Sequence, residues 1–117
     1  MPLDLRTLNW VSKPATEEET MRILKRDHFC CRYCGLDART SLDSALVLGV
    51  DFVIPRARKG RKSEDNLVAC CRSCNTVKGR RIFKNFDEAK AYVLKRREEL
   101  RGLWQSVVPP QSRSATA

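Results

Sequence analysis

The six cysteines of the 117-residue chain fall into two matched clusters, one in CCRYC and the other in CCRSC. Each cluster contains a Cys-x-x-Cys pair, which places two thiolates on one turn. Two such pairs make a closed tetrahedral site of the kind that suits Zn²⁺. We therefore predict a structural zinc ion, rather than disulfides, bound by Cys31, Cys34, Cys71 and Cys74.

One cysteine of each cluster, Cys30 and Cys70, has no ligand role in this arrangement. A Cys-x₃-Cys register that uses either of them is less usual, so we expect both to be small buried apolar residues. Gly35 follows the first pair, and glycine can take the left-handed conformation of such a turn. The 36 residues between Cys34 and Cys71 exceed a compact zinc ribbon, so a folded segment must separate the pairs.

A carboxylate interrupts an apolar run inside that segment. Asp51 lies in ALVLGVDFVIP, whose β-branched and aromatic residues predict a strand that ends at Pro55. An acidic residue in such a run needs either a cation or a chemical role. An ion pair with one of the nearby arginines is the structural alternative to a functional Asp51.

Positive charge is concentrated in the segment that follows Asp51. The formal net charge is +9, and residues 55–84, with ten Lys or Arg and two acids, contribute +8 of it. This concentration indicates a polyanionic partner, most simply nucleic acid. A basic face kept for solubility is the alternative. The predicted contacts to nucleic acid are Arg56, Arg58, Lys59, Arg61, Lys62, Lys78, Arg80 and Arg81.

Three further patterns predict the elements that position these residues. TEEETMRILKRD indicates a helix with Thr16 as its cap and Glu19 completing a capping box. NLVACCRSCNTVKG predicts a short buried helix that stops at Gly79. A last helix should begin near Asn85. The apolar side of this helix, which we expect to face the core, consists of Phe86, Ala89, Val93, Leu100, Leu103 and Trp104.

We expect a single domain over residues 16–107, with an extended leader at 1–15 and a disordered tail at 108–117. The tail is rich in proline and serine. No apolar run is long enough to span a bilayer, so no membrane partner is expected. The first residues lack the pattern of a secretory signal, which favours a cytoplasmic location. The sequence does not decide between monomer and dimer, although the last helix is expected to pack onto the domain.

The order of these pieces resembles the HNH endonucleases, specifically the members in which two Cys-x-x-Cys pairs flank a ββα-metal motif. The pieces are CRYCG, a strand ending in VDFVIP, a basic loop with glycine, NLVACCRSCN and KG. They run from about residue 26 to residue 79. The resemblance implies a small α+β fold, namely a zinc-stapled ββα-metal domain with flanking N- and C-terminal helices.

In that family an Asp-His pair supplies a metal-binding acid and a general base. The resemblance therefore implies that Asp51 and Asn75 bind Mg²⁺ or Mn²⁺ and that Asn66 is the orienting residue. Phe52 stands at the position of the base, and phenylalanine cannot accept a proton. Asn66 could instead cap a helix, and Asn75 could close the second zinc turn. The only histidine, His28, precedes the first cysteine pair.

The resemblance implies an endonuclease-like protein that hydrolyses phosphodiester bonds in DNA with a metal ion. The absent base slows this reaction, since loss of a general base typically costs roughly 10²- to 10⁴-fold in rate. Two other functions stay open. One is a catalytically silent, zinc-stapled module that binds nucleic acid, and the other is a protein-interaction module with incidental charge. Asp51 and Asn75 favour a metal role, whereas Phe52 favours binding without catalysis.

Overall fold

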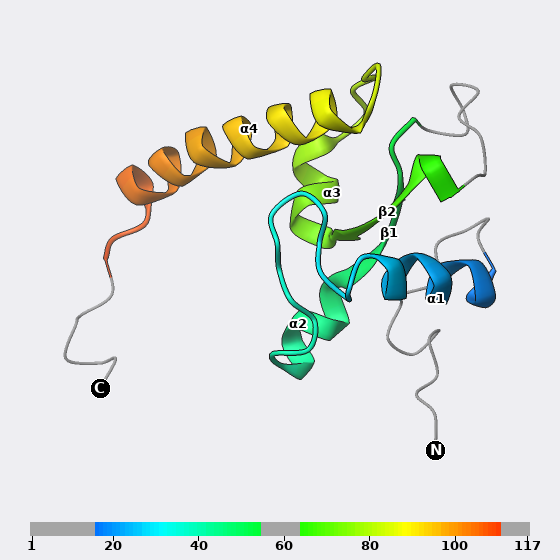
Figure 1. The fold of residues 1–117 in the computed structure, drawn as a ribbon. Coiled ribbons are helices and arrows are strands. Elements are labelled where there is room, and N and C mark those ends of the chain that lie inside the picture. The colour runs from blue at the N-terminus through cyan, green and yellow to red at the C-terminus, as the bar shows by residue number, and fades with distance from the viewer. Residues whose placement is uncertain (1–15, 55–63, 111–117) are drawn as a thin grey trace.

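A computed structural model describes residues 16–54 and 64–110 of the chain. The predicted leader at 1–15, the basic loop at 55–63 and the end of the predicted tail, from 111, lie outside the described residues. The described part is an α+β fold (Figure 1). Its elements are α1 (Glu17–Arg26), α2 (Leu42–Val47), β1 (Leu48–Phe52), the 3₁₀ turn η2 (Glu64–Asn66), β2 (Leu67–Cys71), α3 (Arg72–Lys78) and α4 (Phe86–Val107).

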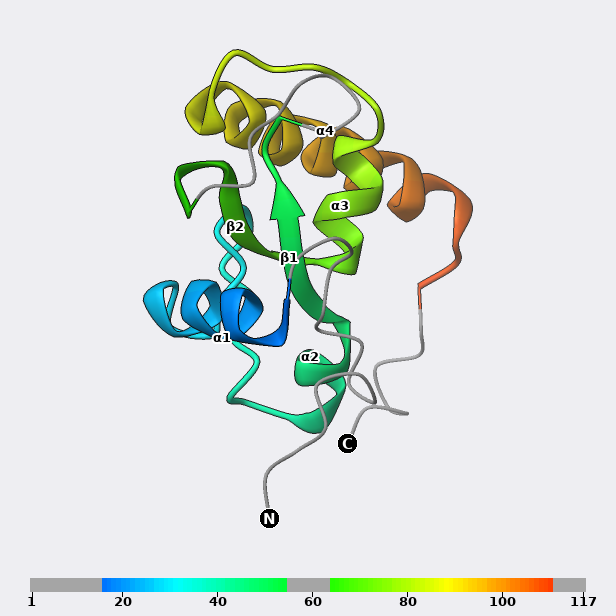
Figure 2. The same cartoon turned by 90° about the vertical axis from the view of Figure 1, so that its right-hand side faces the viewer.

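A two-stranded antiparallel sheet of β1 and β2 forms the centre of the fold. Its register pairs Leu48 with Cys71 and Phe52 with Leu67. All five residues of β2 are buried, because α1 and α3 both pack against the hairpin. Figure 2 shows α1 and α3 on opposite sides of the two strands. The hairpin and α3 together form the ββα unit that the sequence resemblance implies.

The strand predicted over residues 45–55 is shorter than expected. Its first residues belong to α2, and β1 begins only at Leu48. Ser41 caps α2 by accepting a hydrogen bond from the backbone N–H of Ser44 at 3.0 Å. This local cap outweighs the strand propensity of the apolar residues that follow.

The helix predicted over residues 66–79 is wrong in its first half. Residues of β2 pair with β1, and only α3, from Arg72, is helical. Short apolar runs do not distinguish a buried strand from a buried helix, and here pairing with β1 decides. Cys71 is the last residue of β2 and the N-cap of α3. Gly79 ends the helix, as predicted, with a φ of 62°.

The two long helices begin where the sequence predicts. Thr16 and Glu19 form the predicted capping box at the start of α1, with reciprocal hydrogen bonds of 3.1 Å. Asn85 caps α4 by accepting a backbone N–H at 2.9 Å. No described helix is long and apolar enough to cross a membrane.

Only the first half of α4 contributes to the core. Ala89 and Val93 are fully buried, whereas Leu103 and Trp104 are 56% and 57% exposed. The expectation that these two residues are core is therefore wrong. Figure 1 shows the reason, because the later turns of α4 extend away from the sheet.

The outer edge of β2 is closed by Asp27, the buried C-cap residue of α1. Its carboxylate accepts hydrogen bonds from Arg26 at 2.8 Å, from Arg32 at 3.0 Å and from the backbone N–H of Ala69 at 2.9 Å. Arg26 also donates to the backbone oxygen of Leu67 at 2.6 Å. These contacts tie α1 and the first cysteine turn to the edge of the sheet.

Candidate metal centre and nucleic-acid interface

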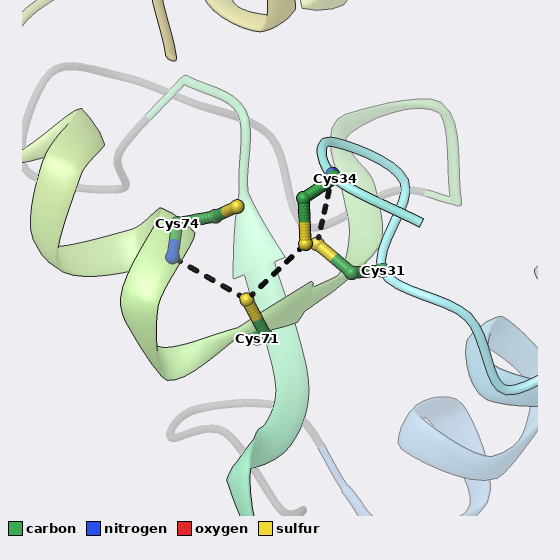
Figure 3. A group of neighbouring side chains, drawn as sticks. All are labelled: Cys31, Cys34, Cys71 and Cys74. Atoms are coloured by element: carbon green, nitrogen blue, oxygen red, sulfur yellow. Dashed lines mark hydrogen bonds between the residues drawn. The ribbon is translucent and has the colours of Figure 1, made fainter. Parts of the chain in front are cut away.

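Four cysteine sulfurs meet between the first cysteine turn and the start of α3 (Figure 3). The sulfurs of Cys31, Cys34, Cys71 and Cys74 all lie within 4.8 Å of one another. A zinc ion with Zn–S bonds of about 2.3 Å requires sulfurs about 3.8 Å apart at the corners of a tetrahedron. The Cys34 and Cys71 sulfurs are 3.7 Å apart. The four side chains therefore fit one zinc-type metal ion, as predicted.

Each cysteine pair forms a turn that presents donors to its own sulfur. The backbone N–H of the second cysteine donates to the sulfur of the first, at 3.5 Å in the first pair and 3.4 Å in the second. Gly35 has a φ of 83°, in the left-handed region predicted for it. From α4, Arg97 reaches the Cys74 sulfur at 3.8 Å. These donors offset the negative charge that four thiolates around a dication leave.

The four thiols cannot all ionise together without a cation. Hydrogen bonds from Cys34 and the other thiols lower the pKa of Cys31, and hydrogen bonding with Cys31 raises the pKa of Cys71 and of Cys74. The Cys31 sulfur raises the pKa of Cys34, but hydrogen bonds with Cys71 and Cys74 outweigh it and bring this pKa to about 6. A bound dication removes this conflict, because it stabilises every thiolate at once.

The remaining two cysteines lie outside the group of four. Cys70 is buried, and its thiol donates to the backbone oxygen of Cys71 at 3.3 Å. Cys30 is half-buried, less than predicted, and its thiol donates to the backbone oxygen of His28 at 3.4 Å. His28 is an exposed residue on the turn between α1 and the first pair.

Asp51 lies on β1 with partners from two other elements. The Lys78 ammonium, at the end of α3, is 3.1 Å from Asp51 Oδ2. The Tyr33 hydroxyl, from the first cysteine turn, donates to the same oxygen at 3.3 Å. The side chains of Lys78 and Asp51 are only 2% and 14% exposed. The acid is thus ion-paired, and its described partner is a buried lysine.

Burial governs the protonation of this group. It raises the pKa of Asp51, and the ion pair with Lys78 and the Tyr33 hydrogen bond only partly oppose the rise. Burial and the charge of Asp51 likewise raise the pKa of Tyr33, which stays a hydrogen-bond donor. Neither of these partners of Asp51 is predicted by the sequence. Neither contact has a local sequence signal, since each joins residues far apart in the chain.

Phe52 does not point into a polar cleft. Its side chain is 9% exposed and packs with Ile23 of α1 and Leu67 of β2. Beside it, Asn66 is no helix cap. Its amide accepts the backbone N–H of Ile54 at 2.8 Å and donates to the Ile54 oxygen at 2.9 Å. This double contact holds the two strands together beyond the last ladder pair.

The segment that contains all these residues matches a known family. Residues 31–81, less than half of the chain, match the family model of the HNH endonucleases. This segment is similar to an HNH domain. The match confirms the predicted resemblance and indicates a nuclease-like or nucleic-acid-binding function for this segment. No curated protein and no solved structure matches the chain.

Within the HNH domain, Asn75 lies on the exposed side of α3. Its side chain makes no hydrogen bond to any described residue, so it does not close the second cysteine turn. The backbone N–H of Cys74 has that role. Among the residues that the structure describes, the four cysteines are the only group of three or more His, Cys, Asp or Glu side chains close enough to share a metal ion.

The HNH domain exposes only part of the predicted basic set. Lys78 is buried, so its assignment as a contact to nucleic acid is wrong. Arg80 and Arg81 are exposed directly after α3, and the Arg81 guanidinium stacks over the Tyr92 ring, 4.7 Å from its centroid. The other five residues belong to the 55–63 loop, outside the described ranges.

Proposed function

We propose that this HNH domain binds DNA and has lost measurable hydrolysis of phosphodiester bonds. The observation that carries the proposal is the burial of Phe52 against Ile23 and Leu67. The residue at the position of the family's general base cannot take a proton, and its ring belongs to the core. A missing general base alone lowers the rate by roughly 10²- to 10⁴-fold.

Binding is supported by the arrangement of charge around the hairpin. The Lys78 ammonium donates to the backbone oxygen of Phe52 at 3.1 Å, which brings the end of α3 to the end of β1. Arg80 and Arg81 follow directly. The basic 55–63 loop begins three residues after Phe52 in the sequence. Arg80 and Arg81 therefore lie near the end of β1, after which residues 56–62 follow in the sequence, and exposed cations at this position can contact phosphates.

The zinc site supports this function by shaping the domain. When bound, zinc supplies folding energy, because the site draws its ligands from two segments far apart in the chain. It holds the turn that carries Tyr33 next to the start of α3. The chain's own residues then bind and orient the backbone of the nucleic acid, and no described residue beside Asp51 is placed to take a proton from water.

DNA binding should weaken steeply with salt. Each phosphate contact contributes about −0.9 to the slope of log affinity against log salt concentration. Replacing Arg80 with alanine should reduce the magnitude of this slope by about 1, with little dependence on DNA sequence. Fluorescence anisotropy with a labelled duplex, measured over a salt series, tests this directly.

Arg39→Ala is the matched control for that measurement. Arg39 is exposed but already paired with Asp37 at 2.9 Å, so its loss should leave the slope unchanged. An affinity that does not respond to salt would contradict the proposal. Tighter binding to an RNA duplex or a single strand of the same sequence would change the assigned partner.

A slow metal-dependent endonuclease is the second candidate. One observation favours it: only Oδ2 of Asp51 has described hydrogen-bond or ion-pair partners, and the side chain is 14% exposed. Oδ1 makes no hydrogen bond to the described residues. A divalent ion that reached this oxygen would activate water without a general base.

A plasmid-nicking assay separates the two candidates. With Mg²⁺ or Mn²⁺, we expect the wild-type protein to nick supercoiled DNA no faster than Asp51→Ala, because the described residues offer neither a general base nor an open metal site at Asp51. The Asp51→Ala protein sets the background from contaminating nucleases. Nicking by the wild type well above that background would establish the slow endonuclease.

A further inference from the structure

The Lys78 ammonium has the surroundings of a bound metal cation. It lies 3.1 Å from Asp51 Oδ2 and donates to the backbone oxygen of Phe52 at 3.1 Å. A carboxylate and a backbone carbonyl are oxygen ligands of the type that Mg²⁺ and Ca²⁺ take. Tyr33 donates to the same carboxylate oxygen and completes its hydrogen bonding.

Lys78 is held in this position by the fold. Its side chain is 2% exposed, although lysine is almost never fully buried without a partner. It occupies the last turn of α3, where the free carbonyls of the helix favour a positive charge. Gly79 then turns the chain with a φ of 62°. The ammonium is therefore a fixed charge beside β1.

A second, catalytic metal ion does not fit the residues present here. The described residues place no other carboxylate with Asp51 in a metal-binding group, and Asn75 is exposed. A dication bound to Asp51 would share the carboxylate with the ammonium of Lys78, whose side chain is buried. Repulsion between like charges is strong in such a buried setting, because the local dielectric is low.

We propose that Lys78 is the resident cation of this site. Its ammonium takes the place that the family gives to a divalent metal ion, and it keeps such ions away from Asp51. In one respect this inference rests on the proposed function. The exclusion of divalent ions from Asp51 would be a second cause, beside the missing general base, of the loss of hydrolysis. It predicts that removing the ammonium creates a divalent metal site that depends on Asp51.

Manganese binding to the full-length, zinc-loaded protein tests the inference. Free Mn²⁺ has a six-line electron paramagnetic resonance spectrum that weakens on binding, and Mn²⁺ does not displace zinc from four thiolates because it prefers oxygen ligands. We expect Lys78→Met to bind one Mn²⁺ at least about tenfold more tightly than the wild type, a difference that titration resolves. The double variant Lys78→Met/Asp51→Asn should lose this site.

Lys84→Met is the matched control, because it removes an equal charge from an exposed position. It should bind Mn²⁺ as the wild type does. The inference would be overturned if the wild type bound Mn²⁺ as tightly as Lys78→Met in a way that depends on Asp51. It would also be overturned if Lys78→Met gained no Mn²⁺ site. If Lys78→Met and Lys78→Gln fail to fold alone, Mn²⁺ should restore their folding. Chains that stay unfolded in saturating Mn²⁺ would also overturn it.

These outcomes are independent of DNA binding. If the wild-type protein binds Mn²⁺ at Asp51, the inferred role of Lys78 is wrong. The salt-dependent DNA contact predicted for Arg80 is not affected by that result. A protein that fails to bind DNA contradicts the proposed function, whatever the manganese titrations give.

Discussion

Removing the metal from the four-cysteine site should unfold the domain. The site joins the turn at Cys31 and Cys34 to the junction of β2 and α3, two segments far apart in the chain. Structural zinc contributes about 10–16 kcal/mol in zinc-finger peptides, comparable to the whole stability of a small domain at about 5–15 kcal/mol. Far-ultraviolet circular dichroism and thermal melting, before and after chelation, measure the effect.

A pair of cysteine variants makes the same test without a chelator. Cys74→Ser removes a ligand and should behave like the metal-free protein. Cys30→Ser changes a half-buried cysteine outside the group of four and should melt close to the wild type. Added zinc should restore the fold of the wild-type protein after chelation. It should restore the fold of Cys74→Ser only in part. An unchanged melting temperature after complete metal removal would contradict the structural role of the site.

Features with a short-range cause could be predicted from the sequence. The spacing within each Cys-x-x-Cys pair determines the turn geometry, so the four ligands and the left-handed Gly35 follow from the sequence alone. The same holds for Thr16 and Asn85, whose side chains bond backbone groups only three residues away. Such interactions depend little on the rest of the fold.

Features decided by long-range contacts could not be predicted. Residues 67–71 have helix-like apolar spacing, but pairing with β1 makes them a strand. The sequence classes Lys78 with the solvent-exposed basic residues, and only the packing of α3 beside β1 reveals it as a buried partner of Asp51. In the same way, α1 supplies the side chain of Ile23 that turns Phe52 into a core residue.

Three of the four positions to which the resemblance assigns a role make contacts that stabilise the hairpin. Phe52 fills the space under α1, Asp51 pairs with Lys78, and Asn66 bonds to the backbone of Ile54. Each contact closes the end of the hairpin near the basic residues after α3. The ββα unit is thus formed while Asp51, Phe52 and Asn66, to which the resemblance assigns roles in the reaction, serve packing, charge pairing and backbone contacts.

Replacing Asp27 with asparagine should destabilise the domain by about 2–4 kcal/mol, because charged hydrogen bonds and a buried ionic partner are lost. The Asp27 side chain is 2% exposed and accepts from Arg26, Arg32 and the Ala69 backbone. Asparagine keeps the shape but has no charge and only one acceptor oxygen. Urea unfolding of the zinc-loaded proteins at neutral pH measures the difference.

Asp37→Asn is the control for this comparison. Asp37 is also bonded to an arginine, Arg39, but it lies at the surface, where ion pairs contribute little. Its loss should leave the free energy of unfolding near that of the wild type. An Asp27→Asn protein as stable as Asp37→Asn would show that the edge of β2 does not depend on the buried carboxylate.

The pH dependence of the Asp27 effect follows from its pKa. Burial raises the pKa of Asp27, but hydrogen bonds and charge from Arg26, together with hydrogen bonds from Ala69 and Arg32, outweigh it and hold the pKa below its usual value. The stabilisation is therefore complete above the unfolded-state pKa of about 3.9 and is lost as pH falls through the lower folded-state pKa. The difference between wild type and Asp27→Asn should stay constant from about pH 5 to about pH 8, since Asp27 is ionised in both states there. A difference that grows as pH falls across this range would mean that the folded-state pKa is raised, and that burial outweighs the arginines at this position.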